Sequence, residues 1–159
     1  MCIRDRSDHA GQLRVYNKEG ITSSYLGDGY YQAYNQFGER TLFLGTGTSG
    51  GGYLRTYNFE GQETMYIGTG ADSSGQLRVY DSAGETGTFL GSGYFRTYNQ
   101  FGKMTTYLGN GRDGGGYLRT NNKFETETSF LGTNNSNEGL INLNDKFGQS
   151  FWIRLNKGN

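Results

Sequence analysis

One phrase recurs along nearly the whole chain: an extended segment, a tight turn and a second extended segment. The first segment reads GQLRVYN from residue 11, and the second reads SSYLG from residue 23. Related phrases begin seven repeats, which start near residues 11, 30, 52, 75, 94, 116 and 139. A regular repeat of this kind indicates a stacked array in which each copy contacts its neighbours.

The spacing between the two segments of a repeat is constant. The leucine-type residue of the first segment precedes that of the second by thirteen positions in six repeats: Leu13 and Leu26, Tyr31 and Leu44, Leu54 and Ile67, Leu77 and Leu90, Phe95 and Leu108, Leu118 and Leu131. Connections between repeats vary in length, as loops outside a constant core do. Frequent glycine and period-two alternation exclude helix and predict an all-β fold.

Two kinds of turn are predicted. Inside a repeat, Asn or Asp in first place and Gly in fourth favour a tight turn, because Asn bonds its own backbone and Gly accepts a positive φ. The instances are Asn17–Gly20, Asn35–Gly38, Asn58–Gly61, Asp81–Gly84 and Asn99–Gly102. Between repeats, Gly27–Tyr30 and Gly91–Tyr94 are predicted to form two-residue primed hairpin turns. Both kinds of turn reverse the chain.

Alternation gives each strand two different faces. In the first repeat Leu13 and Leu26 share an aliphatic face, whereas Arg14, Tyr16 and Tyr25 share a Tyr/Arg face. An antiparallel β-meander and a β-solenoid-like fold both fit this pattern. We favour the meander, because a solenoid would stack like-charged arginines about 4.8 Å apart. An elongated tandem array, assembled as a trimeric fibre, is the expected form.

The chain is expected to form one domain, residues 11–155, with a tail at 156–159. Residues 1–10 are interpreted as a scar and leader, because MCIRDR back-translates to a sequence that resembles a transposon adapter from metagenomic sequencing libraries. In the last repeat Asn142 and Asn144 replace Arg and Tyr, a polar face of the kind that caps arrays. We therefore expect a natural C-terminus and a truncated N-terminus.

Composition restricts the chemistry. The single histidine, His9, and the single cysteine, Cys2, both precede the repeats, so neither a nucleophile–base triad nor a transition-metal site can be assembled from them. We expect a non-enzymatic protein without a cofactor. Fifteen basic residues balance fifteen acidic ones, which argues against nucleic acid as a partner. No apolar run approaches the roughly 20 residues of a membrane helix, so no membrane insertion is expected.

Two aspartates in Gly-rich loops are candidate calcium ligands. Asp72 lies in GTGADSSG and Asp113 in GNGRDGGG. Because the loops lack the nine-residue iteration of calcium-binding β-rolls, Gly-rich turns are the simpler interpretation.

The Tyr/Arg face is the candidate binding surface. Aromatic rings can stack on sugars, and arginine supplies forked hydrogen-bond donors. The candidate ligand-binding residues are Arg14, Tyr16, Arg55, Tyr57, Arg78, Tyr80, Arg96, Tyr98 and Arg119. The same side chains would also stabilise the sheet through cation–π and cross-strand contacts, or pack between subunits. We expect this face to be the less buried of the two.

The scheme of strand, Gly turn, strand and variable loop, with phrases such as LRVYN and FLGTG, resembles the shaft repeats of viral and bacteriophage fibre proteins, including the trimeric triple β-spiral. The resemblance covers residues 11–155. It implies a structural or adhesive fibre segment, such as a phage tail fibre or cell-surface stalk, that forms homotrimers or longer assemblies on a virion or cell surface and contacts a glycan or receptor. Triple β-spirals also use Pro in their turns, and this chain has none.

A second hypothesis is a monomeric glycan-binding or ice-binding β-array. Glycan binding would use the Tyr/Arg face. Ice binding would use a threonine column, formed by Thr41, Thr64, Thr105 and Thr128 and interrupted at Gly87. The state of association separates the two hypotheses.

Overall fold

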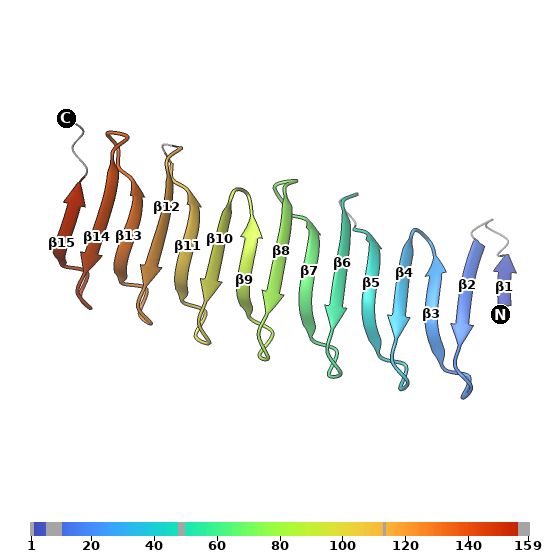
Figure 1. Cartoon of the computed structure of the whole chain (residues 1–159). Helices are drawn as coiled ribbons and strands as arrows, with labels where there is room; N and C mark the ends of the chain where they lie inside the picture. The colour runs from blue at the N-terminus through green and yellow to red at the C-terminus, as the bar shows by residue number, and fades with distance from the viewer. Residues whose placement is uncertain (1, 6–10, 48–49, 113, 156–159) are drawn as a thin grey trace. The chain divides into compact units, whose positions relative to one another are not determined.

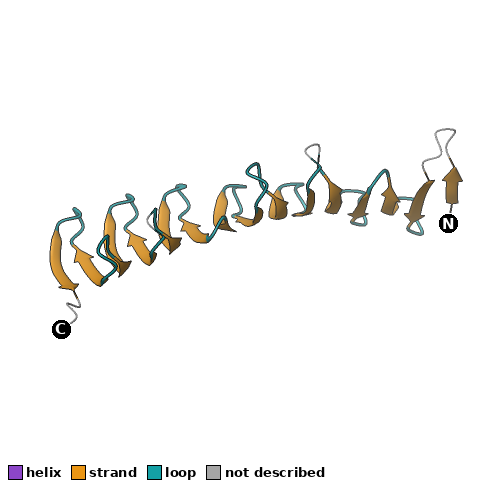
Figure 2. Ribbon diagram, turned by 90° about the horizontal axis from the view of Figure 1, so that it is seen from above, coloured by secondary structure: helices purple, strands orange, loops and turns teal. Residues whose placement is uncertain are grey.

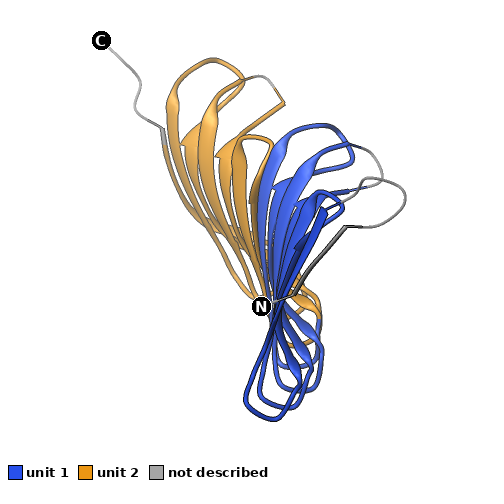
Figure 3. Ribbon diagram, turned by 90° about the vertical axis from the view of Figure 1, so that its right-hand side faces the viewer, with its two compact units in different colours: residues 1–84 blue, residues 85–159 orange. Residues whose placement is uncertain are grey.

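A computed structural model describes residues 2–5, 11–47, 50–112 and 114–155 (Figure 1). The fold is all-β, and the described residues contain no helix (Figure 2). The chain divides into two compact units, residues 1–84 and residues 85–159, coloured separately in Figure 3. The unit boundary falls inside the fourth repeat, between its two strands.

Each unit is an antiparallel sheet whose strands follow chain order. Unit 1 contains β1 (Cys2–Asp5), β2 (Gly11–Tyr16), β3 (Thr22–Gly27), β4 (Tyr30–Tyr34), β5 (Arg40–Thr46), β6 (Gly52–Tyr57), β7 (Glu63–Thr69) and β8 (Gly75–Tyr80). Unit 2 contains β9 (Thr86–Gly91), β10 (Tyr94–Tyr98), β11 (Met104–Asn110), β12 (Gly116–Asn121), β13 (Glu127–Thr133), β14 (Gly139–Asn144) and β15 (Ser150–Leu155).

The meander prediction is confirmed, and the solenoid alternative is wrong. Within each unit, strands that are neighbours in the chain pair antiparallel. The physical reason is the shortness of the connections, since tight turns can join only antiparallel neighbours. A strand begins at each of the seven predicted repeat starts.

The register follows the thirteen-residue spacing. Leu13 lies opposite Leu26 inside a repeat, and Leu44 lies opposite Leu54 between repeats. A continuous row of leucine-type side chains therefore crosses each unit. This aliphatic row comprises Leu13, Leu26, Tyr31, Leu44, Leu54, Ile67 and Leu77 in unit 1, and Leu90, Phe95, Leu108, Leu118, Leu131 and Ile141 in unit 2.

The turns inside repeats form as predicted, and they also introduce a bulge that was not predicted. In Asn58–Gly61, the Gly61 N–H donates to the Asn58 carbonyl at 3.1 Å, and Gly61 has a φ of 78°. The Asn58 Oδ1 accepts from the N–H groups two and four residues later, at 3.0 and 2.9 Å. A left-handed residue at this place produces a bulge, and the register shifts between Thr56 and Tyr57.

The two short turns between repeats also form as predicted. Asp28 and Gly29 have φ angles of 51° and 79°, and Ser92 and Gly93 have 49° and 82°. Positive φ at both central residues confirms the primed hairpin turn. In the longer connections between repeats, the backbone N–H of one residue donates to the carbonyl of the residue four positions later. The turns inside repeats have the same hydrogen bond, so both kinds of loop share one geometry.

The two faces are covered unequally, and the expectation that the Tyr/Arg face is the less buried one is wrong. The buried apolar side chains among the described residues are Tyr25 and Tyr107, 5% and 7% exposed, both on the Tyr/Arg face. In the aliphatic row Leu44 and Leu108 are 49% and 53% exposed. Large rings can cover one another within one layer, whereas short aliphatic side chains need an opposing layer to cover them.

The capping role of the turn asparagine can be tested at Asn58. We expect Asn58→Ala to lower the free energy of unfolding by about 1–3 kcal/mol, because two backbone N–H groups lose their acceptor. Asn58→Asp should retain most of the stability, since Asp145 makes the same two contacts in the last hairpin. Urea unfolding followed by circular dichroism measures both variants, and equal losses for Ala and Asp would contradict the capping role.

Candidate functional site

The Tyr/Arg face is organised by a ladder of aromatic rings from five consecutive strands in each unit. Ring centroids of neighbours lie 4.7–5.8 Å apart. The distances are close to the strand spacing of about 4.8 Å. The ring planes of six neighbouring pairs lie within 15–22° of each other and are stacked, whereas Tyr25–Tyr30 and Phe89–Tyr94 are tilted by 34° and 30°. This aromatic ladder comprises Tyr25, Tyr30, Phe43, Tyr53 and Tyr66 in unit 1, and Phe89, Tyr94, Tyr107, Tyr117 and Phe130 in unit 2.

Glycines opposite the ladder make this close packing possible. Gly68 lies opposite Tyr53, and a Cβ at Gly68 would stand 2.4 Å from the Tyr53 Cβ and 2.8 Å from the Gly52 carbonyl oxygen. A Cβ at Gly45 would also meet the ring of Phe43, two residues earlier, at 3.1 Å. The recurring aromatic-x-Gly phrase is thereby explained, because the ring leans over the backbone of the glycine in its own strand.

Arginines lie over the ladder rings. The distances from the guanidinium carbon to the ring centroid are 5.1 Å for Arg14 and Tyr25, 4.8 Å for Arg55 and Tyr53, 4.2 Å for Arg96 and Tyr94, and 5.9 Å for Arg119 and Tyr107. Arg78 Nη2 donates to Gln76 Oε1 at 3.4 Å. Arg55 also forms a salt bridge with Glu63 at 3.2 Å. Cation–π contacts thus hold most of the predicted arginines on the face.

The predicted tyrosines form a second row nearer the Asn turns. Tyr16 is 48% exposed. Tyr57 carries a guanidinium over its ring, that of Arg40, at 4.5 Å. Burial, and then the carboxylate of Glu63, raise the pKa of Tyr80. Tyr98 lies opposite Met104 in the sheet.

Arg40 was not among the residues predicted for this face. Simple alternation from Phe43 would put Arg40 on the aliphatic face, but the bulge after Ala33 pairs it with Tyr34 on the Tyr/Arg face. The turn that precedes Arg40 was the only available signal, because a left-handed glycine at its end implies such a bulge.

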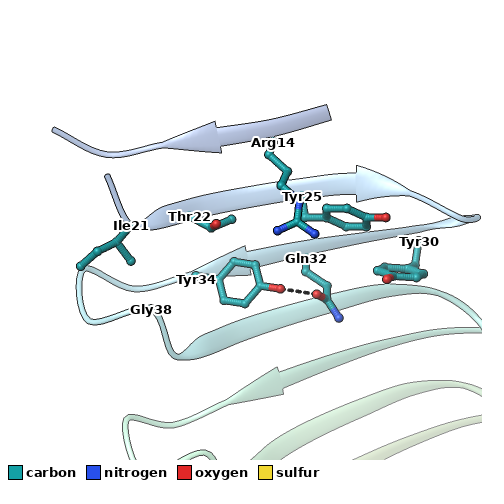
Figure 4. A pocket seen from close by; sticks show the side chains of 8 residues that line it. All are labelled: Arg14, Ile21, Thr22, Tyr25, Tyr30, Gln32, Tyr34 and Gly38. Carbon is teal, nitrogen blue, oxygen red and sulfur yellow. Dashed lines mark hydrogen bonds between the residues drawn. The ribbon is translucent and has the colours of Figure 1, made fainter. Parts of the chain in front are cut away.

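The Tyr/Arg face of unit 1 has two hollows, each lined by arginine and tyrosine side chains. The first, of about 280 Å³, is lined by Arg14, Tyr25, Tyr30, Gln32 and Tyr34, among others (Figure 4). The second, of about 250 Å³, is lined by polar and charged groups that include Arg55, Glu63, Arg78 and Tyr80. The predicted residues of unit 1 therefore lie along a row with two hollows, not in a single pocket.

One of the two calcium candidates, Asp72, lies in the described part of the chain. Asp72 Oδ1 accepts from the N–H and Oγ of Ser74 at 3.1 and 2.6 Å, which fixes its own turn. Asp113 and His9 lie outside the described residues. Within the part of the chain that the structure describes, no three His, Cys, Asp or Glu side chains gather where they could hold a metal ion. That same part contains no helix with the length and apolar character to cross a membrane.

Comparisons with known proteins leave the family open. No protein-family model matches the chain, and no curated protein matches it. Among solved structures, a mutant of S. aureus TarM in complex with Fondaparinux, alpha-GlcNAc-glycerol and UDP is similar over 76% of this chain and 19% of that chain, with 6% identity and a TM-score of 0.30. The chain spans about a fifth of that protein's length, and a likeness at this score bears on neither fold nor function.

The requirement for glycine opposite the ladder can be tested at Gly68. We expect Gly68→Ala to lower the free energy of unfolding by about 1–3 kcal/mol, because its methyl group would overlap backbone and Cβ atoms that cannot withdraw. Gly52→Ala is the matched control, since the nearest atom there is 3.9 Å away. Urea unfolding of the two variants provides the measurement, and equal stability would show that the ladder does not require glycine.

The buried ladder tyrosines predict alkaline destabilisation. Burial, followed by the hydrogen bond from the Tyr25 hydroxyl to Asp28 at 2.8 Å, raises the pKa of Tyr25, and burial raises the pKa of Tyr107. A raised pKa means that the folded state keeps the phenol proton more tightly than the unfolded state. The stabilisation is therefore complete below the unfolded pKa of about 10 and is lost as pH rises above it.

We expect the urea midpoint of the wild type to fall steeply above pH 10, and that of Tyr25→Phe/Tyr107→Phe to fall less steeply. For each protein, the urea midpoint at high pH is compared with the midpoint of the same protein at neutral pH. This comparison removes the constant effect of the Tyr25–Asp28 hydrogen bond that the variant lacks. Identical slopes in the two proteins would show that the buried phenols do not govern the pH dependence.

Proposed function

We propose that the chain is a non-enzymatic structural segment of the fibre or stalk type, and that its copies associate through their aliphatic faces. The observation that carries this proposal is the aliphatic row, which is half-exposed along both units. The leucine-type residues of the second strands are 46–53% exposed, at Leu26, Leu44, Ile67, Leu90, Leu108 and Leu131. A contiguous apolar surface of this kind is uncommon on monomeric proteins and marks interaction sites. A second copy would supply an opposing apolar layer of matching length and spacing.

The aliphatic face of unit 1 is also hollowed. A trough of about 670 Å³ runs beside the row and is lined by Leu26, Leu44, Leu54, Ile67 and several glycines, including Gly45 and Gly68. We infer that this apolar trough is part of the surface that a second copy covers.

Two copies would form a two-layered sandwich, and three could enclose the aliphatic faces inside a prism. The expected homotrimer is compatible with this arrangement. The proposed role depends on contacts between copies of the chain, and it requires no catalytic residue.

The monomeric alternative has two forms, glycan binding and ice binding, and the observations favour the first over the second. Glycan binding is favoured by the two hollows on the Tyr/Arg face. Ice binding is not favoured, because the column threonines bond inside their own hairpins: Thr41, Thr105 and Thr128 donate to backbone carbonyls at 3.3 Å. Thr64 shares a 2.8 Å hydrogen bond with Thr56.

Association through the aliphatic row can be tested with Leu44→Lys/Ile67→Lys. We expect sedimentation equilibrium to show wild-type assemblies of two or more copies, and the double variant to associate at least about a hundredfold more weakly, because two charges would be buried without partners. Circular dichroism should be unchanged, since both positions are half-exposed in the single chain.

Phe37→Lys is the matched control, because Phe37 is exposed at a turn tip outside the aliphatic row. It should associate like the wild type. A wild type that stays monomeric up to millimolar concentration, or a double variant that associates as tightly as the control, would rule out the proposed interface.

A further inference from the structure

In unit 1 the arginines and most of the acidic residues lie in different places, although the whole chain has equal numbers of basic and acidic residues. Four arginines lie on its Tyr/Arg face: Arg14, Arg40, Arg55 and Arg78. Among side chains that the structure describes, Glu63 is the one carboxylate on the strands of this unit. The other described acidic residues of the unit lie in turns: Glu19, Asp28, Glu39, Glu60, Asp72 and Asp81. The face is therefore cationic, and overall neutrality does not exclude an anionic partner.

Two of these arginines are held in place without being neutralised. Arg14 lies 5.1 Å over the ring of Tyr25, and Arg40 lies 4.5 Å over the ring of Tyr57. Neither forms a salt bridge with another described residue. A guanidinium that is already positioned by an aromatic ring loses less freedom when it binds an anion.

The hollow beside Arg14 offers hydrogen-bond donors and no carboxylate. Its polar lining includes Arg14, Gln32 and Tyr34, and none of the described lining residues is acidic. The Tyr34 hydroxyl donates to Gln32 Oε1 (Figure 4), so the oxygen of this amide is occupied and its N–H groups are the donors that Gln32 brings to the lining. Paired N–H donors of arginine match the oxygens of a carboxylate, and those of a sulfate by the same geometry.

We propose that the Tyr/Arg face of unit 1 binds an anionic polysaccharide, with one carboxylate or sulfate group in the hollow beside Arg14. The four arginines extend from β2 to β8, about 29 Å at 4.8 Å per strand, so a small anion could not reach them all. An extended polymer with regularly spaced anionic groups can contact them in sequence. The site does not depend on the aliphatic interface, which uses the opposite face.

The geometry favours a polysaccharide over single-stranded nucleic acid. Nucleic-acid bases need open aromatic faces on which to stack. The ladder rings cover one another, and Arg40 covers one face of Tyr57. Sugar hydroxyls, in contrast, can pair with the amide and phenol groups that line the hollow.

The test is fluorescence anisotropy at low salt with four labelled probes: dextran sulfate, polygalacturonate, uncharged dextran and oligothymidylate. We expect binding of dextran sulfate, polygalacturonate or both, weakened by added salt, and no binding of uncharged dextran. Dextran sulfate alone would identify the group as sulfate, and polygalacturonate alone would identify it as carboxylate. Equal binding of uncharged dextran, tighter binding of oligothymidylate, or no binding of either anionic polysaccharide would overturn the proposal.

Variants connect the binding to the site. Arg14→Gln/Arg40→Gln should weaken binding of the anionic probe at least about tenfold. Lys18→Gln, which removes an exposed cation from a turn of the same unit, should leave binding nearly unchanged. If the Gln variant unfolds by circular dichroism, Arg14→Lys/Arg40→Lys keeps the charge and should give an intermediate loss, because the fork geometry is absent. A folded double variant that binds like Lys18→Gln would overturn the proposal.

Discussion

The contact between a glycine and the tyrosine opposite it is the constraint on which the sheet depends. At Gly132 a Cβ would stand 2.3 Å from the Tyr117 Cβ, and at Gly45 a Cβ would stand 2.5 Å from the Tyr30 Cβ. Only a residue without a side chain allows the rings to lie against the backbone and overlap their neighbours. The ladder then supplies, within one layer, part of the burial that a second layer supplies in most sheets.

The ladder also explains why the two faces differ in exposure. Rings such as Tyr25 and Tyr107 cover their own side of the sheet, and arginines lie over them. Leu44 and Leu108 remain 49% and 53% exposed, because aliphatic side chains in one layer cover less of one another than the larger rings do. The sheet therefore has one face that is complete in a single chain and another that gains stability when an apolar layer covers it. We propose the first as a ligand-binding face and the second as the face that another copy covers.

Much of the fold could be predicted from the sequence. The separation of thirteen positions from Leu13 to Leu26 determines the register once a tight turn joins the strands, and a slip of one residue would mix the faces. The relative burial of the faces could not be predicted, because it depends on how a ring leans over a glycine two residues away. The arginine row was predicted on the correct face. Arg40 and Glu63 were not, because the bulges reverse the face that alternation assigns to them.

The central claim is that the aliphatic face is the one left open for a second copy. Hydroxyl-radical footprinting over a concentration series measures this directly on the unmodified chain. As the protein associates, oxidation of Leu26, Leu44 and Leu108 should fall, while oxidation of Tyr16 should stay constant because it lies on the opposite face. Protection of Tyr16 with no change at the leucines would contradict the account, since the copies would then meet through the Tyr/Arg face.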